Sequence, residues 1–118
     1  MSQILFLVLN KEEYLDDVLT AFVEADITGA TIINSSGMGR VLATDVPIFA
    51  SLRQAMTGKL STSPYNKTIF TVVKDDEQLN TFIELLKDII DLDTPGTGLL
   101  FVLPVTMVKG LSSKGLSF

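Results

Sequence analysis

The sequence predicts one α/β domain in which a four-stranded antiparallel sheet carries two helices on one face, in the order βαββαβ. Three observations support this prediction. The chain has 118 residues, which suits a single domain. Two stretches, 4–34 and 68–103, each have the pattern strand, helix, strand. The apolar stripes of the two helices match, because each member of the second set lies 64 residues after its counterpart: Leu15, Val18, Leu19 and Phe22, then Leu79, Phe82, Ile83 and Leu86.

The first unit begins with residues 4–9, a continuous apolar run typical of a strand at the centre of a sheet. We expect Asn10 to cap the helix that follows, with Glu13 as its capping-box partner. Gly29 ends this helical segment. Residues 30–34 contain β-branched side chains and therefore predict the second strand.

The second unit repeats this plan, with a strand at 68–73, a helix capped by Asp75 or Asp76, and a strand at 99–103 after the turn 95–98. Right-handed crossovers join two such units most simply as a ferredoxin-like split sandwich. The sheet face without helices would also be apolar. Because patches of that size are rare on monomers, we expect a homotrimer to cover it.

Composition excludes several kinds of function. The net charge is −5 and the nine basic residues form no cluster, which argues against nucleic-acid binding. The absence of cysteine and histidine excludes disulfides, thiolate chemistry, zinc sites and histidine catalysis. The apolar runs 4–9 and 94–108 are too short for a signal peptide or a membrane span, so we expect a cytoplasmic protein that is not an integral membrane protein.

Residues 35–67 form a long insertion between two strands that a hairpin could join, and such insertions are usually functional or disordered. The sequence predicts a glycine-containing turn at 35–40, then a short amphipathic helix at 46–56 capped by Asp45. That helix could pack on its own subunit or dock on a partner. Binding to a membrane surface is the least favoured of the three interpretations. The candidate partner-binding residues are Phe49, Leu52, Arg53 and Met56.

Three features could hold an anionic ligand. Gly37 and Gly39 with Arg40 allow close backbone approach and offer a guanidinium fork, and residues 96–98 contain a second glycine pair. Lys67 adds a positive charge before the third strand. Each feature also has a purely structural interpretation. The first motif could be a bulged turn, the second a turn from helix to strand, and Lys67 an ordinary solvated lysine.

The order and spacing of four short motifs resemble the nitrogen-regulatory PII family. They are Leu-Asp-Asp-Val at 15–18, Ile-Thr-Gly-Ala-Thr-Ile at 27–32, Gly-Met-Gly-Arg at 37–40 and Gly-Thr-Gly-Leu-Leu-Phe-Val at 96–102. The resemblance extends from residue 4 to about 108. It implies a ferredoxin-like trimer that binds nucleotide effectors between subunits and contacts target enzymes or transporters through a flexible T-loop.

Carried over by position, the resemblance assigns ligand-binding roles to Thr31, Gly37, Gly39, Arg40, Lys67, Gly96 and Gly98. Residues 41–66 would take the place of the T-loop within a single domain spanning 1–118. Leu99 stands where the family has a phosphate-binding lysine, and the C-terminal Arg-x-Arg is replaced by Gly110-Leu111-Ser112. Three missing cations would remove contacts worth about 1.5–3 kcal/mol each, which disfavours the family's usual mode of ATP binding.

The sequence therefore predicts a regulatory protein and not an enzyme, with no catalytic or metal-binding residues assigned. A small effector, either an adenine nucleotide or another anion, would bind between subunits and change how residues 41–66 engage a partner. The cofactor, the effector and the partner are not defined by the sequence. Two alternatives remain open: a small ferredoxin-like enzyme, or an amino-acid-binding regulatory module.

Overall fold

The computed structural model describes residues 2–45 and 65–111. These residues form four strands, one 3-10 helix and three α-helices. They are β1 (Gln3–Leu9), η1 (Glu12–Tyr14), α1 (Leu15–Glu24), β2 (Thr31–Ser36), α2 (Met38–Asp45), β3 (Tyr65–Val73), α4 (Asp76–Lys87) and β4 (Gly98–Pro104). None of the helices within these residues is long and apolar enough to span a membrane.

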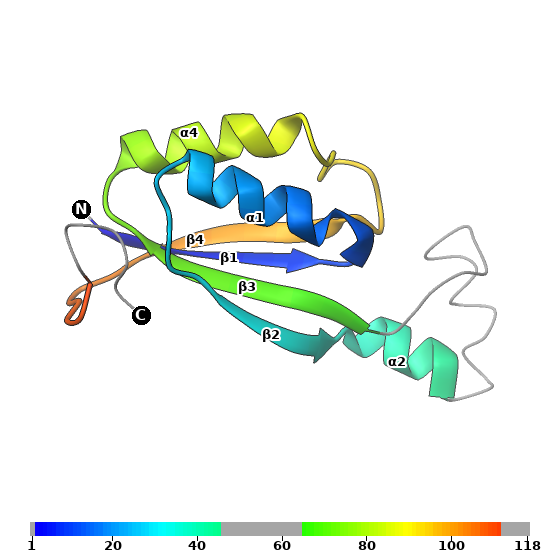
Figure 1. The fold of residues 1–118 in the computed structure, drawn as a ribbon. Helices are drawn as coiled ribbons and strands as arrows, with labels where there is room; N and C mark the ends of the chain where they lie inside the picture. Colours follow the sequence, from blue (N-terminus) through cyan, green and yellow to red (C-terminus); the bar gives the residue numbers. More distant parts are fainter. Residues whose placement is uncertain (1, 46–64, 112–118) are drawn as a thin grey trace.

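The four strands form one antiparallel sheet in the order β2-β3-β1-β4. Helices α1 and α4 lie side by side on one face of this sheet, whereas α2 extends beyond its end (Figure 1). This arrangement confirms the predicted ferredoxin-like split sandwich. Of the two caps predicted for the helix now labelled α4, the structure selects Asp75, whose Oδ1 accepts a hydrogen bond of 2.9 Å from the backbone N–H of Gln78.

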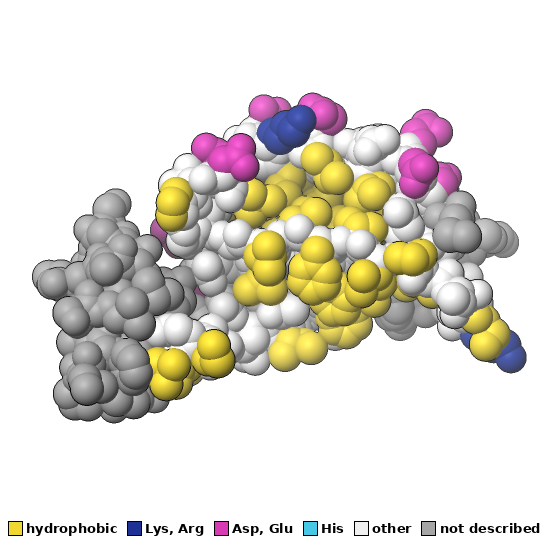
Figure 2. Space-filling view, turned by 180° about the vertical axis from the view of Figure 1, so that it is seen from behind, with side chains coloured by type: hydrophobic (Ala, Val, Ile, Leu, Met, Phe, Trp, Pro, Cys, Tyr) yellow, Lys and Arg dark blue, Asp and Glu magenta, His cyan; other side chains and the backbone are white. Residues whose placement is uncertain are grey.

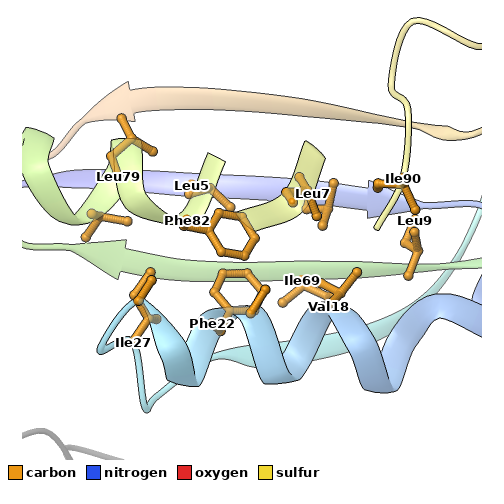
Figure 3. Close-up of a cluster of buried hydrophobic side chains, with 14 residues drawn as sticks. Leu5, Leu7, Leu9, Val18, Phe22, Ile27, Ile69, Leu79, Phe82 and Ile90 are labelled. Carbon is orange, nitrogen blue, oxygen red and sulfur yellow. The ribbon is translucent and has the colours of Figure 1, made fainter. Parts of the chain in front are cut away.

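The core lies between the sheet and the two helices (Figure 3). Leu5, Leu7 and Leu9 of β1 are fully buried because alternate residues of a strand point to the same face. From the helices, Phe22 and Phe82 stack with ring centroids 4.1 Å apart. The matching apolar stripes predicted from the sequence therefore form the helix side of the core.

The opposite face of the sheet carries no helix and is apolar. Phe6, at its centre, stacks on Phe101 with centroids 4.9 Å apart and contacts Phe70 at 5.6 Å. Leu99, Phe101 and Leu103 of β4 are 58%, 39% and 49% exposed. Figure 2 shows hydrophobic side chains gathered into a broad patch on the side of the molecule that carries β4 and α4. Both the bare face and its apolar character agree with the prediction.

The predicted capping role of Asn10 is wrong. The chain first forms η1, whose N-cap residue is Lys11, and no side chain caps it. The Asn10 side chain instead accepts a hydrogen bond from Asn66, 56 residues away. This long-range contact competes with the local cap and replaces it.

The predicted turn at 35–40 is also wrong, because β2 continues to Ser36 and α2 begins at Met38. Asp45, the expected cap of a later helix, is the last residue of α2. Strand β3 begins at Tyr65, three residues before the expected start, because Ser36 pairs with Tyr65. The insertion was expected at 41–66. Its residues 46–64 lie outside the described residues, and they include the four candidate partner-binding residues.

Candidate functional site

One end of the sheet collects most of the predicted ligand-binding residues. Strands β1 and β2 end there, and β3 and β4 begin there (Figure 1). The register places Asn34, Lys67, Leu9 and Gly98 in one row across the four strands. Residues more than 60 positions apart in the chain thus reach one edge of the fold.

The second glycine pair has a structural reason at each position. A Cβ atom at Gly98 would lie 2.3 Å from the carbonyl oxygen of Val8, far inside van der Waals contact. Gly96 has φ +84°, in the left-handed region that side chains rarely adopt, but nothing within 4 Å would meet its Cβ. Close packing therefore requires Gly98, whereas backbone conformation alone favours Gly96.

The loop that contains these glycines is hydrogen-bonded to the end of β1. The backbone N–H of Asn10 donates to the carbonyl oxygen of Thr97 at 3.1 Å, and Thr97 N–H donates to Thr94 at 3.3 Å. Thr97 is only 2% exposed. The loop is thus a fixed part of the sheet end.

A polar network occupies the same end of the open sheet face. Asn66 is 4% exposed; its Nδ2 donates to Asn10 Oδ1 at 3.0 Å, and its Oδ1 accepts from Ser35 Oγ. Ser35 Oγ also lies 2.7 Å from Thr68 Oγ1. Sequence reasoning did not identify this network. Its one sequence signal is the two-residue spacing of Asn66 and Thr68, which places both polar side chains on one face of β3.

The first glycine motif is placed differently from the expectation. Gly37 follows β2, and its carbonyl oxygen accepts the hydrogen bond from Val41 N–H that opens α2. Gly39 and Arg40 belong to the first turn of this helix. Both residues therefore lie next to the sheet end, on a helix instead of a turn.

Lys67 lies at this end of the sheet, whereas Thr31 lies near its middle. The half-buried Lys67 donates from Nζ to Asn34 Oδ1. Thr31 is the first residue of β2 and pairs with Phe70. Asn34, the partner of Lys67, is three residues after Thr31, or about 10 Å along an extended strand. A single chain therefore does not bring Thr31 together with the other predicted ligand-binding residues.

The chemistry available at this sheet end is that of binding. Its described side chains are amides, hydroxyls and one ammonium group, which can donate and accept hydrogen bonds. Over the ranges 2–45 and 65–111, no group of three or more acidic, cysteine or histidine residues could hold a metal ion. The fold and this end of the sheet together define a small ferredoxin-like domain with a polar sheet end.

Comparison with known families identifies the kind of domain. The family described as nitrogen regulatory protein P-II matches residues 5–114, nearly the whole chain. The chain belongs to this family, whose members are regulatory signalling proteins. A search of curated proteins found no match.

A solved structure shares the fold. It is a crystal structure of Arabidopsis thaliana PII bound to citrate, 18% identical in sequence, with a TM-score of 0.58. The match covers 88% of this chain and 77% of that one. At this identity the likeness supports the fold alone.

Proposed function

We propose that this chain is a regulatory subunit, without enzymatic activity of its own, that assembles as a homotrimer. In this proposal a small anionic effector binds between subunits and changes the engagement of a partner protein by residues 41–66. The observation that supports it most directly is the bare apolar sheet face, with Leu99 58% exposed in the single chain. Exposed patches of this kind mark surfaces that another protein covers.

The position of Thr31 favours a binding cleft between subunits. Thr31 lies about 10 Å along β2 from Asn34, the β2 residue in the row that carries Lys67 and Gly98. A neighbouring copy could supply the far end of its own β2 to this cleft. The cleft would then exist only in the assembled trimer, which would couple effector binding to assembly.

The charge at the sheet end favours an effector with less negative charge than ATP. Leu99 occupies the position next to Gly98 where the resemblance implies a lysine. Lys67 already donates one hydrogen bond to Asn34. Because an ammonium group has three donors, the remaining ones can serve a ligand. Because few positively charged side chains lie at this sheet end, a carboxylate or a smaller phosphate fits it better than a triphosphate. Citrate, which the Arabidopsis structure contains, is a suitable probe.

Sedimentation velocity and a thermal-shift screen test this proposal. We expect a species three times the mass of the 12.8 kDa chain, stabilised by citrate or ADP more than by ATP. Lys67→Ala should reduce the affinity about 10-fold to 100-fold, as for a lost charged hydrogen bond. Lys109→Ala, which alters an exposed lysine away from the sheet end, is the matched control. A monomer at micromolar concentration would contradict the proposal.

The partner-binding role of the insertion needs a separate test. Deleting residues 45–57 should abolish capture of the partner but leave the trimer intact, because the deletion spares the whole sheet. Pull-downs with the full-length and shortened proteins, followed by sedimentation of both, make the comparison. Loss of the trimer in the shortened protein would count against the proposed role.

A further inference from the structure

A small hollow lies on the helix side of the molecule, apart from the proposed cleft. It is lined by Lys11 and Tyr14 from the start of the first helical segment, Ile89, Ile90 and Asp91 after α4, and Thr94 and Thr97 before β4. Its volume is about 100 Å³. At about 30 Å³ for each water molecule, this is room for roughly three waters, or for one very small ligand.

Three polar groups at this hollow have no partner within the described parts of the chain. They are the ammonium group of Lys11 and the hydroxyls of Tyr14 and Thr97. Thr97 is the most informative, since the residue is 2% exposed. A buried hydroxyl normally has a hydrogen-bond partner. In residues 2–45 and 65–111 only Gln3 Oε1 is a fully buried and unpaired side-chain atom, so the Thr97 hydroxyl still reaches the hollow.

The lining of the hollow also includes the carboxylate of Asp91. Asp91 Oδ1 accepts from Asp93 N–H and Asp91 Oδ2 accepts from Thr94 Oγ1, both at 3.0 Å. These bonds hold the carboxylate in place but leave it further acceptor capacity. Asp91 and Lys11 do not pair with each other, because the one ion pair of the described residues joins Lys87 to Glu84. A positive and a negative group thus border one hollow without neutralising each other.

From this arrangement we infer that the hollow is a binding site for a small zwitterionic amino acid, such as glycine or alanine. The ligand carboxylate accepts hydrogen bonds from Lys11, Tyr14 and Thr97, and its ammonium group donates to Asp91. Charge-assisted bonds at both ends select a zwitterion over a simple anion or a simple amine. The small volume and the side chains of Ile89 and Ile90 exclude amino acids with long side chains.

The site would act on the proposed cleft through Thr97, which lies between Gly96 and Gly98. Its occupant would therefore hold the loop whose carbonyl oxygen accepts from Asn10. Amino-acid binding itself does not depend on the trimer or on an effector in the cleft. Failure of one proposal thus leaves the other testable.

An NMR titration of the ¹⁵N-labelled full chain with glycine and with L-alanine tests the inference. We expect saturable shifts of the amides of Lys11, Thr94 and Thr97. Acetate and methylamine, which carry one charge each, and L-leucine, which is too large, should bind at least 10-fold more weakly. Binding of acetate as tight as that of glycine would overturn the assignment to a zwitterion, and the absence of any saturable shift would overturn the site.

Matched variants separate binding in this hollow from binding elsewhere. Thr97→Val keeps the shape and removes the hydroxyl, Tyr14→Phe removes only an oxygen, and Lys11→Gln removes the charge. Each should raise the dissociation constant for glycine about 10-fold or more. Thr106→Val and Lys109→Gln, at exposed positions outside the hollow, should leave it unchanged. Equal affinity of Thr97→Val and the unaltered protein would contradict the site.

Discussion

At the scale of single residues, close packing and hydrogen bonding place different demands on the end of the sheet. The two glycines before β4 look equivalent in the sequence, yet only Gly98 has backbone atoms within contact distance of an added Cβ. Asn66 similarly differs from Asn34, the other asparagine of the described strands. It is buried and bonded on both sides, whereas the exposed Asn34 bonds only to Lys67.

Gly98→Ala is expected to lower the free energy of unfolding by about 1–3 kcal/mol, the usual cost of overpacking. The added methyl group would meet the Val8 carbonyl oxygen at 2.3 Å, and backbone cannot move aside as a flexible side chain can. Urea denaturation measures the change. Gly96→Ala is the control and should cost less, because only its φ of +84° opposes a side chain. Equal losses in the two variants would show that packing against Val8 is not the cause.

Asn66→Ala should destabilise the protein by about 1–3 kcal/mol, because it leaves Asn10 Oδ1 and Ser35 Oγ with fewer partners in a part-buried site. Combining it with Asn10→Ala in a double-mutant cycle should give a coupling energy of about 0.5 kcal/mol or more. Asn34→Ala, at an exposed position in the neighbouring row of the sheet, is expected to change stability by less than about 0.5 kcal/mol. Strict additivity in the cycle would argue that the contact contributes nothing.

At the scale of elements, the two core helices begin by different means. Helix α4 has a side-chain cap at Asp75, and the Gln78 side chain accepts from Lys74 N–H at 2.9 Å. Helix α1 has no such cap and is preceded by η1. The C-terminal end of α1, in contrast, has a specific stop signal. Asp26 has φ +68°, and the N–H of Ile27 donates to the carbonyl oxygen of Phe22 at 2.8 Å, as in a Schellman motif.

Asp75→Ala should destabilise the protein by about 0.5–2 kcal/mol through loss of the cap of α4. Thermal unfolding followed by circular dichroism can measure this. Asp75→Asn keeps an acceptor oxygen and should recover most of the loss. Asp76→Ala, one residue later, removes only an interaction with the helix dipole and should cost about 0.3–1 kcal/mol. A larger effect at Asp76 than at Asp75 would reject the assigned cap.

At the scale of the whole molecule, the sheet has one face covered by its own helices and one face left apolar. Phe6, Phe70 and Phe101 form an aromatic row across β3, β1 and β4 on the open face. The stacked Phe22 and Phe82 occupy the covered face. The chain thus builds two apolar layers but supplies helices for only one of them.

Phe101→Asp should convert the proposed trimer into a monomer, because a charge buried at a subunit interface costs several kcal/mol. Sedimentation velocity would show the change in mass, and circular dichroism should show that the fold is retained. Val23→Asp is the control, at an equally apolar position that is 61% exposed on α1. Trimers that persist in Phe101→Asp would mean that another surface holds the copies together.

The sequence alone was sufficient for the βαββαβ order of the four strands and the two core helices, for the apolar stripes of both helices, and for narrowing the cap of α4 to Asp75 or Asp76. These features depend on spacing within a few residues, and local periodicity records them directly. The resemblance to PII proteins was also visible there, in the order of four short motifs. The family match over residues 5–114 confirms it.

Tertiary structure decided the features that depend on contacts between distant parts of the chain. Asn10 pairs with Asn66 instead of capping a helix, α2 replaces the predicted turn, and Gly98 packs against Val8. The hollow between Lys11, Asp91 and Thr97 likewise brings together three segments that no local pattern connects. The physical reason is that hydrogen bonding and close packing depend on position in space, which the sheet register sets and short-range periodicity does not contain.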